Sequence, residues 1–134
     1  MNSPKPCLFC QIVSGVIDKT ILFENETGFV VRDGFPITQG HTLIIPKQHI
    51  GSFFDITQEQ RQDLFALVDL AKADLDKQYQ PASYNIGIND GEAAGQTIPH
   101  LHIHLIPRYI EAGKAPRGGV RWLVPEKADY WSKS

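Results

Sequence analysis

The most regular pattern in the chain is the alternation of apolar residues with histidines along residues 100–107. A period of two residues indicates a β-strand with two unlike faces. One face carries apolar side chains, which we expect to pack in the core: Leu101, Ile103 and Leu105. The other face carries three imidazoles, each about 7 Å from the next: His100, His102 and His104. Such a row is wide enough for a phosphate group or a metal ion beside the middle ring.

Short apolar runs predict four further strands, at residues 20–24, 29–32, 42–45 and 84–89. The Asn and Gly between the first two runs favour a hairpin. Residues 57–79 have the three-and-four spacing of an amphipathic helix, with Thr57 and Gln60 placed for a capping box and Pro81 beyond the end. A short helix is expected before Gly15. These elements predict an α+β fold, with one long helix on a mainly antiparallel sheet of about five strands.

A loop of small and polar residues, 89–97, directly precedes the histidine strand. Its glycines let the backbone come close to a ligand and let successive N–H groups converge on an anion. Gln96 and Thr97 add side-chain donors beside the histidines. A glycine loop or a lone histidine is common without any function, but three histidines at strand spacing after such a loop favour an anion site.

Length and charge narrow the class of protein. The 134 residues suffice for one domain with a sizeable core, and the net charge of −2 offers no basic surface for nucleic acid. No apolar run approaches the roughly 18 residues of a membrane helix, and residues 1–6 lack the apolar core of a signal peptide. We therefore expect a cytoplasmic protein without nucleic-acid or membrane partners. We expect a single domain over residues 1–134, with residues 111–134 as a C-terminal tail.

The two cysteines, Cys7 and Cys10, lie three positions apart. A structural disulfide is disfavoured in a reducing compartment, and so short a loop would add little stability. A redox Cys-x-x-Cys pair is expected in a βαβ context, which this chain does not offer. Half of a zinc site is the better interpretation if two further ligands exist. The five histidines of the chain lie in just two segments, 41–49 and 100–104.

The motif formed by the 89–97 loop and residues 100–106 resembles that of the histidine triad (HIT) family, whose signature is His-φ-His-φ-His-φ-φ with φ apolar. Residues 40–50 also resemble the family, so the resemblance covers most of the chain. It implies a histidine-triad fold and a nucleotide hydrolase or transferase that acts at the α-phosphate. Related transferases carry Gln at the third triad position, so His104 favours a hydrolase.

The resemblance implies a role for each candidate site residue. His102 matches the nucleophile, which would form a covalent nucleotidyl-histidine from a dinucleoside polyphosphate or a nucleoside phosphoramidate. His104 and His41 complete the expected catalytic group, and His41 would lie behind the triad. Asp33 matches an acidic residue that holds the ribose hydroxyls, with a turn aspartate as the alternative. The other expected nucleotide-binding residues hold the phosphoryl oxygens or the loop, together with His104: Asn89, Gly95, Gln96 and Thr97.

Members of the family with a Cys-x-x-Cys pair close a structural zinc site with two histidines. This sequence has all four ligands: Cys7, Cys10, His49 and His100. A Cys2His2 site leaves no open coordination position, so zinc would be a structural cofactor that holds the N-terminus on the sheet. The alternative is a pair of free thiols, with His100 only supporting His102.

The smaller members of the family form homodimers with a continuous sheet. The pattern here also favours a two-fold dimer, because one helix covers only one face of the sheet. Two non-enzymatic functions stay open: a metal-binding ridge made by the three triad histidines, and a nucleotide-binding module without catalysis. The basic residues from Arg108 onward, with Trp122, could contact a polyphosphate and a base, or belong to a solvated tail.

Overall fold

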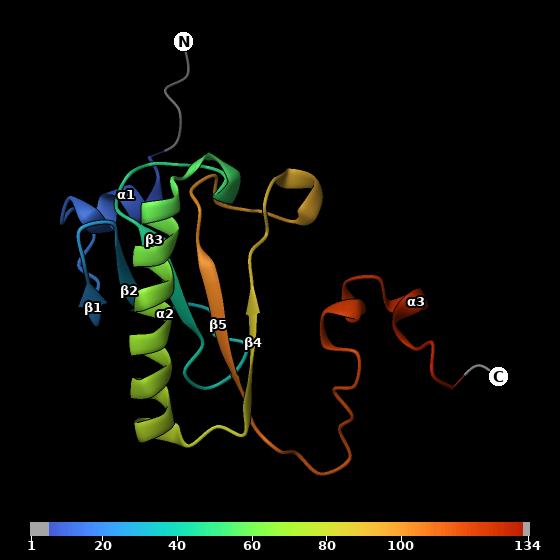
Figure 1. Cartoon of the computed structure of the whole chain (residues 1–134). Helices are drawn as coiled ribbons and strands as arrows, with labels where there is room; N and C mark the ends of the chain where they lie inside the picture. Colours follow the sequence, from blue (N-terminus) through green and yellow to red (C-terminus); the bar gives the residue numbers. More distant parts are fainter. Residues whose placement is uncertain (1–5, 133–134) are drawn as a thin grey trace.

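The computed structural model describes residues 6–132 and shows one five-stranded antiparallel sheet in the order β1-β2-β3-β5-β4 (Figure 1). The strands are β1 Phe23–Glu24, β2 Gly28–Arg32, β3 Thr42–Pro46, β4 Ser83–Gly87 and β5 Ile103–Arg108. The helices are α1 Leu8–Val13, α2 Gln58–Tyr79 and α3 Pro125–Ala128, with 3₁₀ turns η1 Phe53–Asp55, η2 Glu92–Ala94 and η3 Gly119–Leu123. The expected α+β architecture, with one long helix and a short N-terminal helix, is confirmed.

The β1–β2 hairpin is tied to α2 by the side chain of Asn25. Its carboxamide oxygen accepts the Gly28 N–H at 2.9 Å, and its Nδ2 donates to the Asp63 carbonyl at 2.9 Å. Glycine is required at position 28, because a Cβ there would lie 2.6 Å from Leu64 Cδ2 and 2.8 Å from the Ile45 carbonyl oxygen. The hairpin therefore fits closely beneath the long helix.

Helix α2 begins and ends where the sequence predicts. Thr57 Oγ1 accepts the Gln60 N–H at 3.1 Å, and Gln60 Oε1 accepts the Thr57 N–H at 2.8 Å, which completes the capping box. The helix ends at Gln80, whose φ of 48° is left-handed, just before Pro81. Phe65 has a position in the three-and-four apolar spacing of residues 57–79, yet its side chain is 49% exposed. The buried face consists of Leu64, Leu67, Ala71 and Leu75.

The sheet carries an apolar layer on each face. On the α2 face the buried side chains include those assigned to the core by the alternation: Leu101, Ile103 and Leu105, with Val30 and Ile44. On the opposite face α1 packs Phe9 and Ile12 against the sheet. The sheet residues of that second layer are Phe29, Val31, Leu43 and Ile45. The triad imidazoles therefore belong to the α1 face.

The β5 ladder begins at Ile103, later than the expected start at residue 100. The segment before it is held by loops, since the His100 N–H donates to the Ile98 carbonyl at 2.8 Å and the Leu101 N–H to the Ile50 carbonyl at 2.7 Å. β1 is also shorter than expected because only Phe23 and Glu24 pair with β2. These differences lie at strand ends and leave the topology unchanged.

After β5 the chain runs out beside β4 and forms a small C-terminal unit around η3 and α3 (Figure 1). Arg117 lies over the Trp131 ring and Arg121 over the Tyr130 ring, each with its guanidinium carbon 4.4 Å from the ring centroid. The Trp122 indole N–H donates to the Arg117 carbonyl at 2.8 Å. Across residues 6–132 we find no helix with the length and apolar character that a membrane span requires.

Candidate active site

A cleft of about 480 Å³ opens on the α1 face of the sheet. It is lined by α1, by the end of β2 and the segment after it, by β3, by the loop before the triad and by the start of β5. Of the residues that the sequence assigned to nucleotide binding or catalysis, six line it: Asp33, Asn89, Gly95, Thr97, His102 and His104. Gln96 and His41 do not line the cleft, but each makes a hydrogen bond to a residue that does. Gln96 bonds to the Ile98 carbonyl, and His41 bonds to the His104 ring.

The His102 imidazole is oriented by the backbone. Its side chain is buried, with 7% exposed, and its Nδ1 lies 2.9 Å from the His100 carbonyl oxygen. A carbonyl oxygen only accepts, so Nδ1 carries the proton and Nε2 keeps a free lone pair. This is the tautomer that a nitrogen nucleophile needs.

A second backbone contact fixes the protons of His41 and His104. The Ile37 N–H donates to His41 Nδ1 at 3.2 Å, so the proton of His41 is on Nε2. His41 Nε2 then donates to His104 Nδ1 at 2.9 Å, which leaves the proton of His104 on Nε2. His104 Nε2 is buried and has no partner among the described residues. The ring centroids of His102 and His104 are 5.0 Å apart, so an unused donor lies beside the nucleophile.

Burial keeps this pair of imidazoles neutral. Desolvation is the main cause that lowers the pKa of His104 to about 4, and the neighbouring His102 and His41 act in the same direction. Desolvation also lowers the pKa of His41, partly offset by the carboxylate of Asp33. At pH 7 both rings are therefore uncharged, and His104 offers a neutral N–H donor rather than a cation.

Asp33 serves two contacts at the entrance to the cleft. Its Oδ1 accepts the Phe35 N–H at 2.8 Å, which makes it a turn aspartate, and its Oδ2 lies 3.4 Å from His41 Nε2. Asp33 is therefore a turn aspartate, and its side chain also lines the cleft.

The loop before the triad is shaped by two glycines and one glutamine. Gly91 and Gly95 have φ values of 98° and 94°, which a side chain would strain. The Gln96 carboxamide accepts the Gly91 N–H at 2.8 Å and donates to the Gly51 and Ile98 carbonyls at 3.0 Å. Gln96 therefore holds the loop with its side chain, while Gly95 and Thr97 line the cleft.

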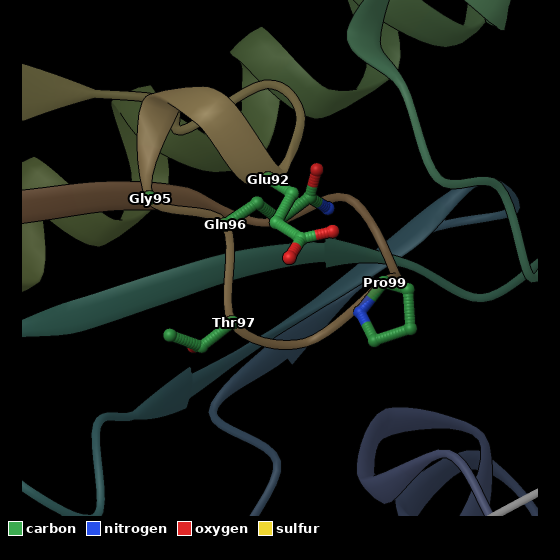
Figure 2. Close-up of a pocket in the computed structure, with 5 residues that line it drawn as sticks. All are labelled: Glu92, Gly95, Gln96, Thr97 and Pro99. Atoms are coloured by element: carbon green, nitrogen blue, oxygen red, sulfur yellow. The ribbon is translucent and has the colours of Figure 1, made fainter.

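The same loop borders a second, more open cavity of about 570 Å³, which we call the outer cavity. Figure 2 shows its five lining residues, with Glu92 and Gln96 on one side of the loop and Pro99 at its far end. Gly95 and Thr97 line both cavities, so the two meet at the loop. Glu92 is the charged side chain of this outer cavity.

The four residues expected to bind zinc lie together between α1, the end of β3 and the triad segment. Their ligand atoms all lie within 4.8 Å of one another. His100 Nδ1 is 3.2 Å from Cys7 Sγ, 3.6 Å from Cys10 Sγ and 3.2 Å from His49 Nδ1, and Cys10 Sγ is 3.3 Å from His49 Nδ1. We call this group the Cys–His cluster.

The donor chemistry of the Cys–His cluster fits zinc. Tetrahedral zinc, with Zn–S near 2.3 Å and Zn–N near 2.0–2.1 Å, separates its ligand atoms by roughly 3.3–3.8 Å. His100 Nε2 donates to the Pro46 carbonyl at 2.8 Å, so its Nδ1 presents a lone pair to the cluster. Burial and the neighbouring Cys7 raise the pKa of Cys10, and a cation would offset this by stabilising the thiolates.

The triad histidines do not form one ridge. Among residues 6–132, two groups of potential ligands come together, the Cys–His cluster and the trio Asp33, His41 and His104. His100 belongs to the first group, His104 to the second and His102 to neither. In the second group the 2.9 Å contact of His41 with His104 is a hydrogen bond. The ridge hypothesis, which needs one metal on all three triad rings, does not match this geometry.

The sequence did not reveal the apolar wall of the cleft. Leu8, Phe9 and Ile12 of α1 line it, together with Ile17 and Phe35. Helix α1 spans six residues, too few to show a clear helical period of apolar residues. The sequence pattern of this segment indicates only metal binding, through its cysteines. Phe35 is 91% exposed, which is unusual for a large apolar side chain and marks it as a surface that a ligand can cover.

Comparisons with known proteins identify the family of this chain. The model of the HIT domain matches residues 14–111. The chain is 35% identical over 122 residues to "Protein hit" of Bacillus subtilis, covering 91% of this chain and 82% of that protein. It is 31% identical over 128 residues to a bis(5'-adenosyl)-triphosphatase of Saccharomyces cerevisiae, covering 95% of this chain and 58% of the yeast protein.

Solved structures show the same fold. A Zn-bound histidine triad family protein from Mycobacterium smegmatis superposes with a TM-score of 0.73 at 34% identity, covering 81% of this chain and 79% of that one. The Cys–His cluster is consistent with this Zn-bound relative, and the family model and the relatives show that the chain belongs to the HIT (histidine triad) family.

Proposed function

We propose that this chain is a nucleotide hydrolase that acts at the α-phosphate through a nucleotidyl-His102 intermediate. The observation that carries the proposal is the pair of ring nitrogens in the cleft. His102 Nε2 holds a free lone pair, and the neighbouring His104 Nε2 holds a buried proton without a partner. A nucleophile beside an unused donor matches an electrophilic phosphorus that carries anionic oxygens.

The reaction has two displacements. In the first, His102 Nε2 forms a bond to phosphorus while the bond from phosphorus to the leaving group breaks, and the leaving group takes the bonding electrons and a proton from solvent. The Nδ1–H bond to the His100 carbonyl stabilises the imidazolium that results. In the second, water attacks phosphorus, the P–N bond breaks, and a proton is released to solvent. The nucleoside monophosphate leaves, and His102 returns to its neutral form.

The cleft provides separate places for the parts of a nucleotide. The apolar wall formed by Phe9, Ile12 and Ile17 suits a base, and the carboxylate of Asp33 suits the ribose hydroxyls. His104, Thr97 and the loop at Gly95 and Asn89 border the place left for the phosphoryl group. The yeast relative is named a bis(5'-adenosyl)-triphosphatase, which supports a nucleotide substrate. A dinucleoside polyphosphate and a nucleoside phosphoramidate both contain the required α-phosphate.

We also propose that zinc binds Cys7, Cys10, His49 and His100. With four protein ligands it would have no open position, so it supplies structural stability and no bond to the substrate. The Zn-bound relative from Mycobacterium smegmatis supports this assignment. The side chain of His100 would then bind zinc, while the carbonyl oxygen of His100 orients the ring of His102.

A His102→Asn variant tests the proposed function. Since only the covalent step loses its partner, we expect turnover to fall by at least about a thousandfold while AMP binding stays within about tenfold. Mass spectrometry of the wild type, quenched during turnover of a dinucleoside polyphosphate or a phosphoramidate, should show an added nucleotidyl group that the variant lacks. Near-normal turnover by His102→Asn would refute the assignment. A wild type that binds AMP without turning over either substrate would favour the non-catalytic module.

A further inference from the structure

One aromatic ring of α1 touches both the Cys–His cluster and the nucleophile. Phe9 lies between Cys7 and Cys10 in the sequence and is 2% exposed. Its ring centroid is 5.4 Å from that of His100, in an edge-on contact at 78°, and 5.1 Å from that of His102, at 58°. The same side chain lines the cleft. Phe9 is therefore a wall of the proposed nucleotide site and a neighbour of the proposed zinc site.

A second connection runs through the backbone of the triad segment. His100 contributes Nδ1 to the Cys–His cluster and its carbonyl oxygen to the Nδ1–H of His102. A shift of the His100 main chain on metal binding would therefore act directly on the orientation of the nucleophile. The cluster and the catalytic imidazole share one residue and one neighbouring ring.

Helix α1 depends on these contacts for its position. It has six residues and no side-chain N-cap, and a helix of this length is not stable alone in water. Among the described residues, the backbone hydrogen bonds that residues 7–17 make outside the helix ladder stay within that segment. What fixes α1 to the sheet is the apolar packing of Phe9 and Ile12 and the contacts of its two cysteines with His49 and His100.

We propose that metal in the Cys–His cluster and nucleotide in the cleft bind with positive coupling, transmitted by α1 with Phe9 as the positioning residue. The proposal rests on the proposed function, because it needs the cleft to bind a nucleotide. Metal holds α1 on the sheet and so forms the apolar wall before the nucleotide arrives. A nucleotide packed against Phe9 holds α1 in the same place and favours metal binding. The factor is the same in both directions, since coupling between two binding sites is reciprocal.

The wild-type protein tests the coupling without any substitution. Calorimetry would measure AMP affinity for the zinc-loaded protein and for the chelator-treated protein, and competition with a chromophoric chelator would measure zinc affinity with and without AMP. We expect both affinities to rise by the same factor, at least about fivefold. Equal AMP affinities in the two forms would overturn the coupling and leave the proposed function intact. Absence of AMP binding in both forms would overturn the proposed function and the coupling with it.

Two matched substitutions test the part played by Phe9. Phe9→Leu keeps an apolar wall but removes the ring between His100 and His102, so the coupling factor should fall toward one while both ligands still bind. Phe35→Leu makes the same change at the exposed rim of the cleft, so it should weaken AMP binding equally with and without zinc and preserve the factor. A wild-type coupling factor in Phe9→Leu would overturn the role of this ring. If Phe9→Leu does not fold, the His102 ring ¹⁵N resonances of the wild type give the decision, because coupling predicts that they shift when zinc is removed.

Discussion

Two hydrogen bonds to the backbone set the chemistry of the site at the scale of single residues. The His100 carbonyl accepts a hydrogen bond from His102 Nδ1, and the Ile37 N–H donates a hydrogen bond to His41 Nδ1. Because His41 Nε2 then donates to His104 Nδ1, the tautomer of His41 also determines that of His104. As a result two adjacent rings present opposite polarity to the cleft, a lone pair on His102 and a proton on His104. The functional arrangement thus depends on main-chain atoms as much as on the histidines themselves.

The low pKa of His104 predicts how stability depends on pH. An unfolded histidine titrates near 6.5, while burial holds the folded pKa of His104 at about 4. Below pH 6.5 the unfolded chain therefore binds a proton that the folded chain rejects, and the free energy of unfolding falls as the pH drops from 6.5 toward 4. The loss from this one group approaches about 3 kcal/mol at the lower end.

Urea unfolding of the wild type and of His104→Gln between pH 4 and pH 7.5 measures this effect. The variant should show a smaller loss of stability on acidification, because glutamine does not titrate. Both proteins contain the same Cys–His cluster, so acid release of any metal cancels in the difference. Parallel pH profiles for the two proteins would contradict the buried neutral state of His104.

At the scale of elements, what the sequence predicted well was encoded locally. The capping box and three-and-four spacing defined α2, and the alternation of apolar residues with histidines separated the two faces of the triad segment. The start of β5 was not predictable in this way, because it depends on the contact of Leu101 with Ile50, 51 positions away in the chain. The role of α1 in the cleft was not predictable for the same reason, because it depends on the contacts of Phe9 with His100 and His102, more than 90 positions away in the chain.

The Cys–His cluster predicts that α1 is held in place by metal. Purified wild-type protein, never exposed to chelator, should contain about one zinc per chain, because four protein ligands complete a tetrahedral site. Replacing Cys7 and Cys10 with serine should remove most of the metal and lower the melting temperature, since binding energy at a structural site contributes to folding. A matched Ser14→Ala substitution, just beyond α1 and outside the cluster, should leave metal content unchanged. Metal-free wild-type protein with the stability of a zinc-supplemented sample would support free thiols instead.

At the scale of the whole molecule, one side of the sheet is left incomplete. β4 is an edge strand of five residues, whereas the opposite edge, β1, has two. Ile86 on β4 is 62% exposed, and the neighbouring C-terminal unit exposes Val120 (72%) and Leu123 (76%). Figure 1 shows this unit beside β4, and a Cβ on Gly119 would lie 3.4 Å from Asn85 Nδ2. Apolar side chains at an unpaired edge favour association with another copy.

We therefore predict a two-fold homodimer in which β4 pairs with its symmetry mate and continues the sheet. Sedimentation at micromolar concentration should show a species of twice the 15.0 kDa chain mass. Ile86→Lys should weaken the dimer at least about tenfold, because a charge on an edge strand opposes pairing of a second strand. Ile21→Lys introduces the same charge near β1, at the opposite edge of the sheet, and should leave the dimer intact. A wild type that sediments as a single chain would refute the dimer, and equal effects of the two lysines would place the interface elsewhere.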